Sequence, residues 1–537
     1  MTHPRVLLAA LAVGLVACSV DALPPRVPTA EVKLAASPAA PPTSPLCPST
    51  ASLFASLREP VTVTAYVTRG TPQLDAFVRR LDDLLAAYAR VGGHKFGFAI
   101  VDANDADTKK KAKEAGLLEQ PFDGAPGAGA NERGPSGYMG LVLRYGEKQQ
   151  PLKFMPPGRT DGLEAWITSK IREIHEGADG VHHVIGVLTG HGELLPAETN
   201  LVPPTLGQFS MQKIITDNFS FFTFVNVDLE GGARPVPDEC EGLIVTQPAE
   251  DLTERELRRI DQFVMKGRTL AVFAGAANVK AGDAAMTAVM STHGLERLLD
   301  GYGIAMNDDV VVDVDAATHV SALTTQGYVV VAALPQILEA RDDRPPRGDE
   351  WLIDTRFLGF FRTERVVVPF PSSLTIRPER QPLATTSVVL RSTGTAAHLT
   401  GPTVDLGPFQ KWRRKLDSLP RQRFAIAADV EGTLTTAFPG GDPQGVETPA
   451  RSARAARVFV LASPQFLANP LARAGDPADP GVAGPGASSL AENELLLAGP
   501  YAKAFVAGSI LVFKNTLDWL TLDDASWACF DYDPQGR

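Results

Sequence analysis

The stretch Val184-Ile-Gly-Val-Leu-Thr-Gly-His-Gly-Glu193 joins a continuous apolar run to a turn that contains two glycines. A short apolar run that ends in turn residues is typical of a β-strand covered on both faces, and parallel sheets are built from such strands. We therefore predict a strand at Val184–Leu188, with the turn Thr189–Glu193 at its carboxyl end.

Predicted helices and strands alternate from this strand onward. A helix at Gln208–Asn218 leads to a strand at Phe221–Leu229, and Thr253-Glu-Arg-Glu256 is a capping box that opens a helix ending at Met265. This alternation predicts an α/β fold with a doubly wound, mostly parallel sheet and a C-terminal extension over residues 181–526. The other predicted elements are strands at Gly242–Thr246, Arg268–Phe273, Asp309–Val314, Thr363–Phe370, Thr386–Arg391, Phe424–Val430 and Arg457–Ala462, and helices at Leu295–Tyr302 and Ala504–Leu520.

A smaller α/β unit at residues 58–176 precedes this domain. Its order of elements suits a thioredoxin-like sheet, but the unit contains no cysteine, so we expect no thiol–disulfide exchange there. The predicted elements are a strand at Val61–Val67, an amphipathic helix that begins at Thr71-Pro72, strands at Phe96–Val101 and Tyr138–Tyr145, and a helix at Gly162–Ile174.

Residues 1–18 have the pattern of an export signal. Met1–Arg5 carries one Arg, and Val6–Ala17 is apolar or small. Leu15-Val-Ala-Cys18 resembles a bacterial lipobox, in which Cys18 is lipidated after cleavage. An uncleaved anchor and simple secretion are the alternatives. All three place the protein outside the cytoplasm, so we expect a location in the cell envelope, anchored through the N-terminus and facing the periplasm or the exterior.

Residues 19–57 are predicted to be a proline-rich tether. Eight prolines fall between Pro24 and Pro48, among Ala, Ser and Thr. This composition favours extended conformations and cannot bury a core. At the other end of the chain, we interpret residues 527–537 as a tail.

Charge and cysteine content exclude several classes of protein. The chain has 51 Lys and Arg against 62 Asp and Glu, a formal net charge of −11, whereas binding of nucleic acid needs clustered basic residues. No P-loop motif for ATP occurs. Four widely spaced cysteines exclude a zinc ribbon and a disulfide-dense scaffold; they are Cys18, Cys47, Cys240 and Cys529.

The turn Thr189–Glu193 is the best candidate for a recognition site. It follows a strand at the edge where doubly wound sheets bind ligands, and Gly190 and Gly192 allow backbone conformations closed to larger residues. His191 and Glu193 suit a base with its orienting group, a pair of metal ligands, or a turn that satisfies its own backbone. No nucleophile in a strand-to-helix elbow accompanies them. We therefore predict a structural or recognition turn, and no catalytic, cofactor-binding or metal-binding residue.

Three other groups of residues have plainer interpretations. Cys240, just before a predicted strand, is interpreted as a packed thiol. His182 and His183 are adjacent in a strand and point to opposite faces, so we do not expect them to share a metal ion. A set of carboxylates lacks the order of an EF-hand and is interpreted as a solvated strand end; it comprises Asp308, Asp309, Asp313 and Asp315.

Several segments together resemble the gliding-motility-type ABC transporter auxiliary proteins, the GldG family. Their order and spacing over residues 44–524 carry the resemblance. The segments are Ser44–Thr50, Leu57–Tyr66, His191–Glu193, Cys240–Val245, Leu252–Leu257, Gly294–Leu299, Val310–Asp313, Val458–Ala462 and Asn515–Leu520.

The resemblance implies a thioredoxin-like N-terminal domain followed by a GIFT-type domain, which is similar to glutamine amidotransferases but generally lacks their catalytic residues. It also implies an extracytoplasmic partner of an ABC-2-type permease and, through that permease, of an ATPase subunit. Members of the family usually finish with a membrane helix, whereas this sequence stops at Arg537. Either the chain is truncated, or its N-terminus is its only attachment.

Our first functional hypothesis is therefore a non-catalytic, membrane-anchored auxiliary subunit of an ABC-2-type transport system, without a cofactor and without nucleic acid. Two alternatives belong to other classes. One is a divergent amidotransferase-like hydrolase that uses His191 and Glu193, and the other is a stand-alone ligand-binding lipoprotein.

Overall fold

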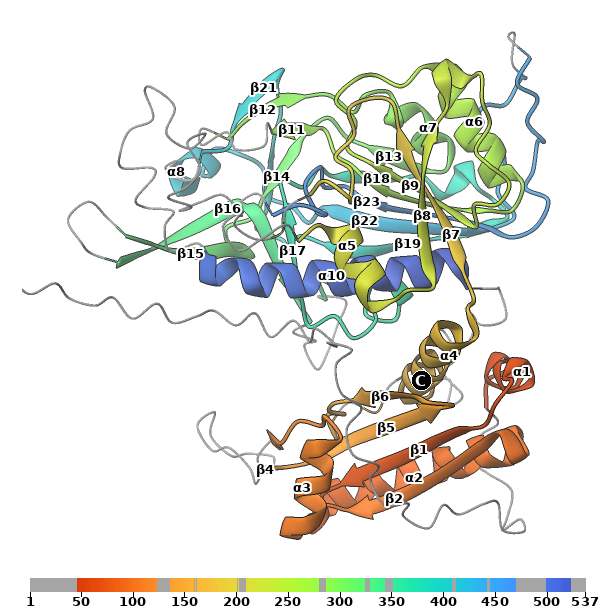
Figure 1. Cartoon of the computed structure of the whole chain (residues 1–537). Coiled ribbons are helices and arrows are strands. Elements are labelled where there is room, and N and C mark those ends of the chain that lie inside the picture. Colours follow the sequence, from red (N-terminus) through yellow and green to blue (C-terminus); the bar gives the residue numbers. More distant parts are fainter. Residues whose placement is uncertain are drawn as a thin grey trace, which may run out of the picture. The chain divides into compact units, whose positions relative to one another are not determined.

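The computed structural model divides the chain into two compact units, an N-terminal unit that is described from residue 46 to 182 and a C-terminal unit from 183 to 522 (Figure 1). The described residues are 46–522 except for 123–135, 159, 161, 200, 202–208, 280–285, 324–328, 343–350, 408–411, 442–444 and 470–498. The predicted signal with Cys18 and the predicted tail at 527–537 lie outside the described residues.

The N-terminal unit is built on a four-stranded sheet with the strand order β2-β1-β5-β6. The central strand β1 (Val61–Val67) runs parallel to β2 (Phe96–Asp102) and antiparallel to β5 (Met139–Tyr145), which pairs antiparallel with β6 (Lys148–Leu152). A further pair, β3 (Gln120–Pro121) and β4 (Ser136–Gly137), stands apart from this sheet.

Helices cover this sheet. Helix α2 (Pro72–Gly92) begins where the Thr71 hydroxyl accepts a hydrogen bond from the Leu74 N–H, and Pro72 occupies its first turn. The apolar face of α2 and that of α4 (Leu163–Asp179) are buried in one core with strands β1 and β5. Helix α3 (Ala106–Glu114) begins at Asp105, whose carboxylate accepts two backbone N–H groups.

The end of the predicted tether is part of the folded unit. Residues Pro48–Ser56 form helix α1, and Phe54, only 2 % exposed, packs edge-on against Tyr88 and Phe96. The Glu164 carboxylate fixes the start of this helix, because it accepts hydrogen bonds from the N–H of Cys47 and the hydroxyl of Thr50. Pro48 signals the first turn of a helix rather than an extended chain. Residues 19–45 of the predicted tether lie outside the described part.

The C-terminal unit is built on a nine-stranded sheet with the order β13-β18-β22-β23-β10-β9-β7-β8, and β19 pairs with β22 beside β18. One half is parallel: β8 (Phe222–Asp228), β7 (His183–Thr189), β9 (Gly242–Thr246), β10 (Thr269–Phe273) and β23 (Ala456–Leu461). The other half is antiparallel: β22 (Ala425–Gly432), β19 (Ala384–Arg391), β18 (Leu374–Ile376) and β13 (Ile304–Met306).

The predicted α/β class is confirmed, but the sheet is mixed rather than mostly parallel. Parallel neighbours need long crossover connections, whereas antiparallel neighbours can be joined by loops. Helix α6 (Glu254–Met265) supplies such a crossover between β9 and β10. Strands β22 and β23 are joined by a segment without a described helix, and they pair antiparallel.

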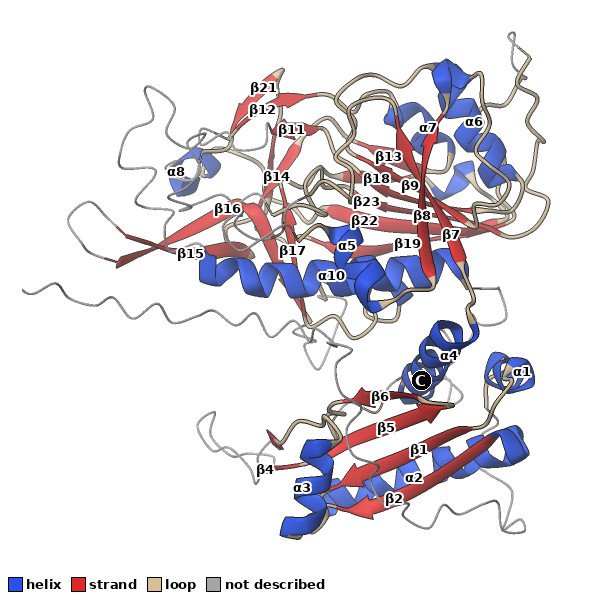
Figure 2. Ribbon diagram, in the orientation of Figure 1, coloured by secondary structure: helices blue, strands red, loops and turns tan. Residues whose placement is uncertain are grey.

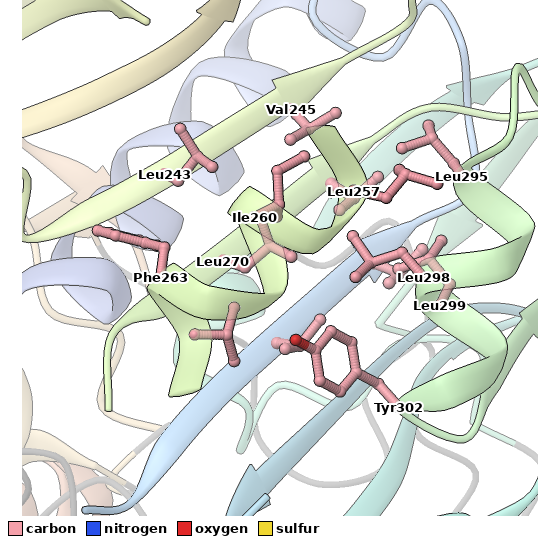
Figure 3. Packing of buried hydrophobic residues seen from close by; sticks show 14 of the residues in the cluster. Leu243, Val245, Leu257, Ile260, Phe263, Leu270, Leu295, Leu298, Leu299 and Tyr302 are labelled. Carbon is pink, nitrogen blue, oxygen red and sulfur yellow. The ribbon is translucent and has the colours of Figure 1, made fainter. Parts of the chain in front are cut away.

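Helices lie on both faces of the parallel half of the sheet (Figure 2). Helix α6 and helix α7 (Leu295–Gly301) pack on one face through Leu257, Ile260 and Leu298 (Figure 3). The long helix α10 (Gly499–Thr521) packs on β9 and β10, and the Thr269 hydroxyl donates a hydrogen bond to the Leu520 carbonyl. None of the described helices has the length and apolar character needed to span a membrane.

Smaller sheets surround the main one, and two predicted strands belong to them. Residues 309–314 and 363–370 contain β14 and β17, which pair outside the nine-stranded sheet. The remaining elements are β11 (Ala277–Val279), β12 (Thr287–Met290) and β21 (Thr403–Asp405); β14 (Val310–Val312) and β20 (Ala397–Leu399); β15 (Ala317–Leu323), β16 (Val329–Arg341) and β17 (Arg365–Pro369); and helices α5 (Met211–Asn218) and α8 (Trp412–Leu416).

Candidate functional site

The parallel half of the sheet has a switch point between β7 and β9. From β7 the chain crosses to β8 on one side, and it then returns to β9 on the other side of β7. At such a point the connections leave the carboxyl ends of adjacent strands in opposite directions, and the crevice between them is where open α/β sheets bind ligands.

A cleft of about 440 Å³ lies at this point. Its volume falls within the range of pockets that hold small ligands, roughly 300–1,000 Å³. The turn after β7 and the segment after β9 form two of its sides, the small β11–β12 sheet forms a third, and the segment after β23 closes it. The lining residues are Gly192, Glu193, Leu194, Gln247, Pro248, Ala249, Asn278, Val279, Val289, Ser291, His293, Pro464 and Gln465.

The glycines shape the turn that borders the cleft. Gly190 has φ +116° and Gly192 has φ +66°, both in the region that favours glycine. A Cβ atom at position 190 would lie 3.2 Å from Oδ1 of Asp228. The carbonyl of His191 accepts hydrogen bonds from the backbone N–H groups of Ala249 and Glu250, which joins the turn to the segment after β9.

His191 is buried between two carboxylates. Its Nδ1 lies 3.0 Å from Oε1 of Glu193, and its Nε2 lies 3.1 Å from Oε2 of Glu256 at the start of α6. The second oxygen of Glu193 accepts the backbone N–H of His191. Glu256 also completes the capping box with Thr253 and accepts the N–H of Gly231. Through its contact with Glu256, the His191 ring therefore links the connections that follow β7, β8 and β9.

The electrostatics of this cluster favour a charged ring. Burial lowers the pKa of His191, but the hydrogen bond to Glu193 and the negative charge of Glu256 outweigh burial, so the pKa lies above its usual value. Burial raises the pKa of Glu256, yet hydrogen bonds from Thr253 and the charge of His191 outweigh it, so that pKa is lowered. When the imidazole is protonated at both nitrogens, each N–H can donate a hydrogen bond to one of the two carboxylates.

This arrangement does not suit acid–base catalysis by His191. A general base needs a free nitrogen within hydrogen-bond reach of its substrate, and both ring nitrogens are occupied by carboxylates. Cys240 is a free thiol with 0 % exposure in the core, and burial raises its pKa to about 11. A thiol with a raised pKa carries little thiolate and is a poor nucleophile.

A second histidine fixes the opposite wall of the cleft. The Asn278 side-chain NH₂ donates to the carbonyls of Ala276 and Ser291, which turns its Oδ1 toward Nε2 of His293, 3.1 Å away. Nδ1 of His293 lies 2.9 Å from Oδ1 of Asp251. The His293 ring is thus held between two acceptors, as the His191 ring is.

Gln247 links the main sheet to this wall. It follows β9 directly, its side-chain NH₂ donates to Oδ1 of Asn278 over 2.7 Å, and its Oε1 accepts the N–H of Gly275 after β10. Gln465, after β23, donates its side-chain NH₂ to the carbonyl of Val279. The segments that follow three neighbouring strands are therefore connected through amide side chains.

Only part of the predicted recognition turn lines the cleft. Gly192 and Glu193 line the cleft, whereas Gly190 and His191 lie beside it and hold its wall. Sequence reasoning missed Gln247, Asn278, His293 and Gln465. A signal existed for two of them, because Gln247 and Gln465 follow strands whose carboxyl ends lie at the same edge.

The other sequence candidates lie apart from the cleft. Nδ1 of His183 lies 2.9 Å from Oε2 of Glu241. Asp309 accepts hydrogen bonds from Ser373 and Nδ1 of His398 lies 2.8 Å from its Oδ2, so it joins strands instead of facing solvent. Asp313 similarly accepts the N–H and hydroxyl of Thr393. In the described part of the chain, no three His, Cys, Asp or Glu side chains are grouped to hold a metal ion.

Comparisons with known proteins bear on both units of the chain. A family model described as "ABC-type uncharacterized transport system" matches residues 182–499, and one described as "Domain of unknown function (DUF7088)" matches residues 45–144. A solved structure titled "mmIFT52 N-terminal domain" is 13 % identical and covers 64 % of this chain and 98 % of its own, with a TM-score of 0.28. A search of curated proteins found no match. Since the first model spans more than half of the sequence and the whole cleft, the chain belongs to the family of ABC-type uncharacterised transport systems.

Proposed function

We propose that the chain is a non-catalytic auxiliary subunit of an ABC-2-type transport system, located outside the cytoplasm in the cell envelope. In this role it binds a permease or an envelope component through the cleft between β7 and β9. The observation that carries the proposal is the position of this cleft at the switch point of the sheet, inside the segment that matches the transport family.

The histidines support a binding role over a catalytic one. Both ring nitrogens of His191 face carboxylates, and those of His293 face Asp251 and the Asn278 amide. Rings held in this way stiffen the walls of the cleft. A recognition site benefits from such rigidity, since less conformational freedom is lost on binding.

The finer fold assignments belong to the same proposal. The strand order β2-β1-β5-β6, with β1 and β2 parallel and the other pairs antiparallel, supports a thioredoxin-like N-terminal domain. The parallel order β8-β7-β9-β10-β23, with helices on both faces, supports a GIFT-type domain related to amidotransferases.

A disulfide supports the location in the envelope. Cys47 is disulfide-bonded, and disulfides persist in oxidising compartments such as the bacterial periplasm. The export-signal pattern of residues 1–18 and the lipobox-like Cys18 agree with that location.

Co-purification from native membranes tests the proposal. The full chain with a C-terminal tag should recover an ABC-2-type permease and its ATPase subunit after mild solubilisation, and a tagged lipoprotein of another system is the control. Recovery from the cytoplasmic fraction without transporter components would overturn the proposal. So would glutaminase or esterase turnover by the purified chain that disappears in His191→Ala.

A further inference from the structure

We propose that the cleft between β7 and β9 binds an uncharged peptide segment with small apolar side chains. This inference rests on the proposed function, because it takes the cleft as the recognition site and names the chemistry of its ligand.

The charges around the cleft argue against an ionic ligand. Glu193 and His293 are the two ionisable residues among the described lining residues, and each is already engaged by a partner within the protein. No Lys or Arg is among the described residues that line the cleft. A phosphate or carboxylate placed there would lose its hydration without gaining an opposite charge from these residues, and such burial is costly.

The shape-forming residues of the cleft are aliphatic. Leu194, Val279 and Val289 lie beside Pro248 and Pro464, and no Phe, Tyr or Trp is among the described lining residues. Nucleobases usually rest on aromatic side chains, so these walls do not suit them. Val289 is 56 % exposed although it is apolar, and a ligand with small apolar groups would remove that surface from water.

Two polar groups of the cleft have unused hydrogen-bonding capacity of opposite kind. Gln465 is only 8 % exposed, and its NH₂ donates to the Val279 carbonyl, which fixes the orientation of the amide. Its Oε1 accepts no hydrogen bond from the described residues. The Ser291 oxygen accepts the N–H of His293, and its own proton is donated to no described residue.

One free acceptor and one free donor match the two polar groups of a peptide unit. Gln465 Oε1 would accept a backbone N–H of the ligand, and the Ser291 hydroxyl would donate to a carbonyl. A ligand that fills the cleft would shield both groups from water, and buried polar groups without partners are costly. A ligand that supplies both partners avoids this cost, whereas a purely apolar ligand does not.

Peptide binding to the purified full chain tests this proposal. The probes are fluorescein-labelled, C-amidated pentapeptides of Ala, Val and Pro, and a matched set carries one Asp or one Lys at the centre. Fluorescence polarisation should show saturable binding of the uncharged set and weaker binding of both charged sets. Gln465→Leu, which removes the acceptor, should weaken binding roughly tenfold, the effect of one buried hydrogen bond.

Val289→Asp is a second test of the cleft that should not disturb folding, because Val289 is exposed and the replacement leaves the core unchanged. It should abolish peptide binding, whereas Val331→Asp, at a 68 % exposed valine on β16, should leave it unchanged. Thermal unfolding of each variant verifies the fold.

Three results would overturn the proposal. The first is an absence of binding by every uncharged peptide at millimolar concentration, and the second is peptide binding that Val289→Asp does not affect. The third is binding of maltotriose or inorganic phosphate that Val289→Asp abolishes. Because the assay needs only the purified chain, its failure is distinguishable from a failure to recover the permease.

Discussion

Nε2 of His191, in the turn after β7, lies 3.1 Å from Oε2 of Glu256, in the first turn of α6. The two residues are separated by the whole β8 strand and by β9, yet both are almost fully buried at the same edge of the sheet. The contact joins the turn that borders the cleft to the capping box of a core helix. The geometry of the cleft therefore depends on the stability of this helix start.

The first prediction concerns the stability supplied by His191. His191→Ala leaves Glu193 and Glu256 without their shared partner, and unpaired buried carboxylates are unfavourable. We expect the C-terminal unit to lose roughly 1–3 kcal/mol in free energy of unfolding, measured by urea denaturation of the full chain. His94→Ala, at an exposed histidine of the N-terminal unit, is the control. Equal stability of both variants would contradict the prediction.

The second prediction concerns the pH dependence of the same contact. The pKa of His191 is raised in the folded state, so the charged ring stabilises folding fully below its unfolded pKa, about 6.5. This contribution is lost as the pH rises through the raised folded pKa. The pKa of Glu256 is lowered in the folded state. Its carboxylate therefore stabilises folding above the pKa of the unfolded chain, and this stabilisation is lost as the pH falls through the lowered pKa of the folded state.

Unfolding of wild type and His191→Gln between pH 5 and pH 9 measures this effect. The stability difference between them should be largest near pH 5 to 6 and should shrink above the raised pKa of His191. A difference that grows with increasing pH would show that the neutral ring is the stabilising form.

The third prediction concerns the backbone at Gly190. Any side chain there is strained by φ +116°, and a Cβ would lie 3.2 Å from Oδ1 of Asp228. Gly190→Ala should therefore destabilise the C-terminal unit by roughly 1–3 kcal/mol and weaken binding in the cleft. Gly394→Ala is the matched control, because its Cβ would meet no atom within 4 Å and its φ is not positive. Equal loss in both variants would contradict the role of the turn.

The parallel strands of the C-terminal unit are the part of the fold that the sequence predicts best. Strands β9, β10 and β23 are buried at every position and β7 is buried at its centre, so each contains an apolar stretch that can be recognised without knowledge of its neighbours. Strands β13 and β18 have three residues each, and their pairing joins segments about 70 residues apart. No local pattern carries that information.

The candidate site is predictable on one side only. The turn after β7 is recognisable because two glycines surround His191 directly after a strand. The opposite wall depends on contacts such as Gln247 with Asn278, and Gln465 with Val279, which connect residues 31 and 186 positions apart. Single polar residues after strands are common, and only the folded sheet shows which of them meet.

The last prediction concerns the partner of Cys47 and links it to the lipidation of Cys18. Cys47 is disulfide-bonded, and Cys240 is a free, buried thiol, which leaves Cys18 and Cys529 as partners. If Cys18 carries a lipid through a thioether, its sulfur is not available, and Cys529 alone remains. Disulfide mapping of the protein purified from membranes should therefore recover a Cys47–Cys529 peptide that disappears on reduction.

A fatty-acid analogue supplied to the cells should label the wild type but not Cys18→Ser, and the Cys47–Cys529 peptide should persist in that variant. Cys240→Ser is the control, since its thiol is enclosed in the core and takes no part in the pairing. A peptide that links Cys47 to Cys18 would contradict both the pairing and the lipidation, because one sulfur cannot form a disulfide and a thioether together. An uncleaved N-terminal anchor and simple secretion would then remain as the alternatives.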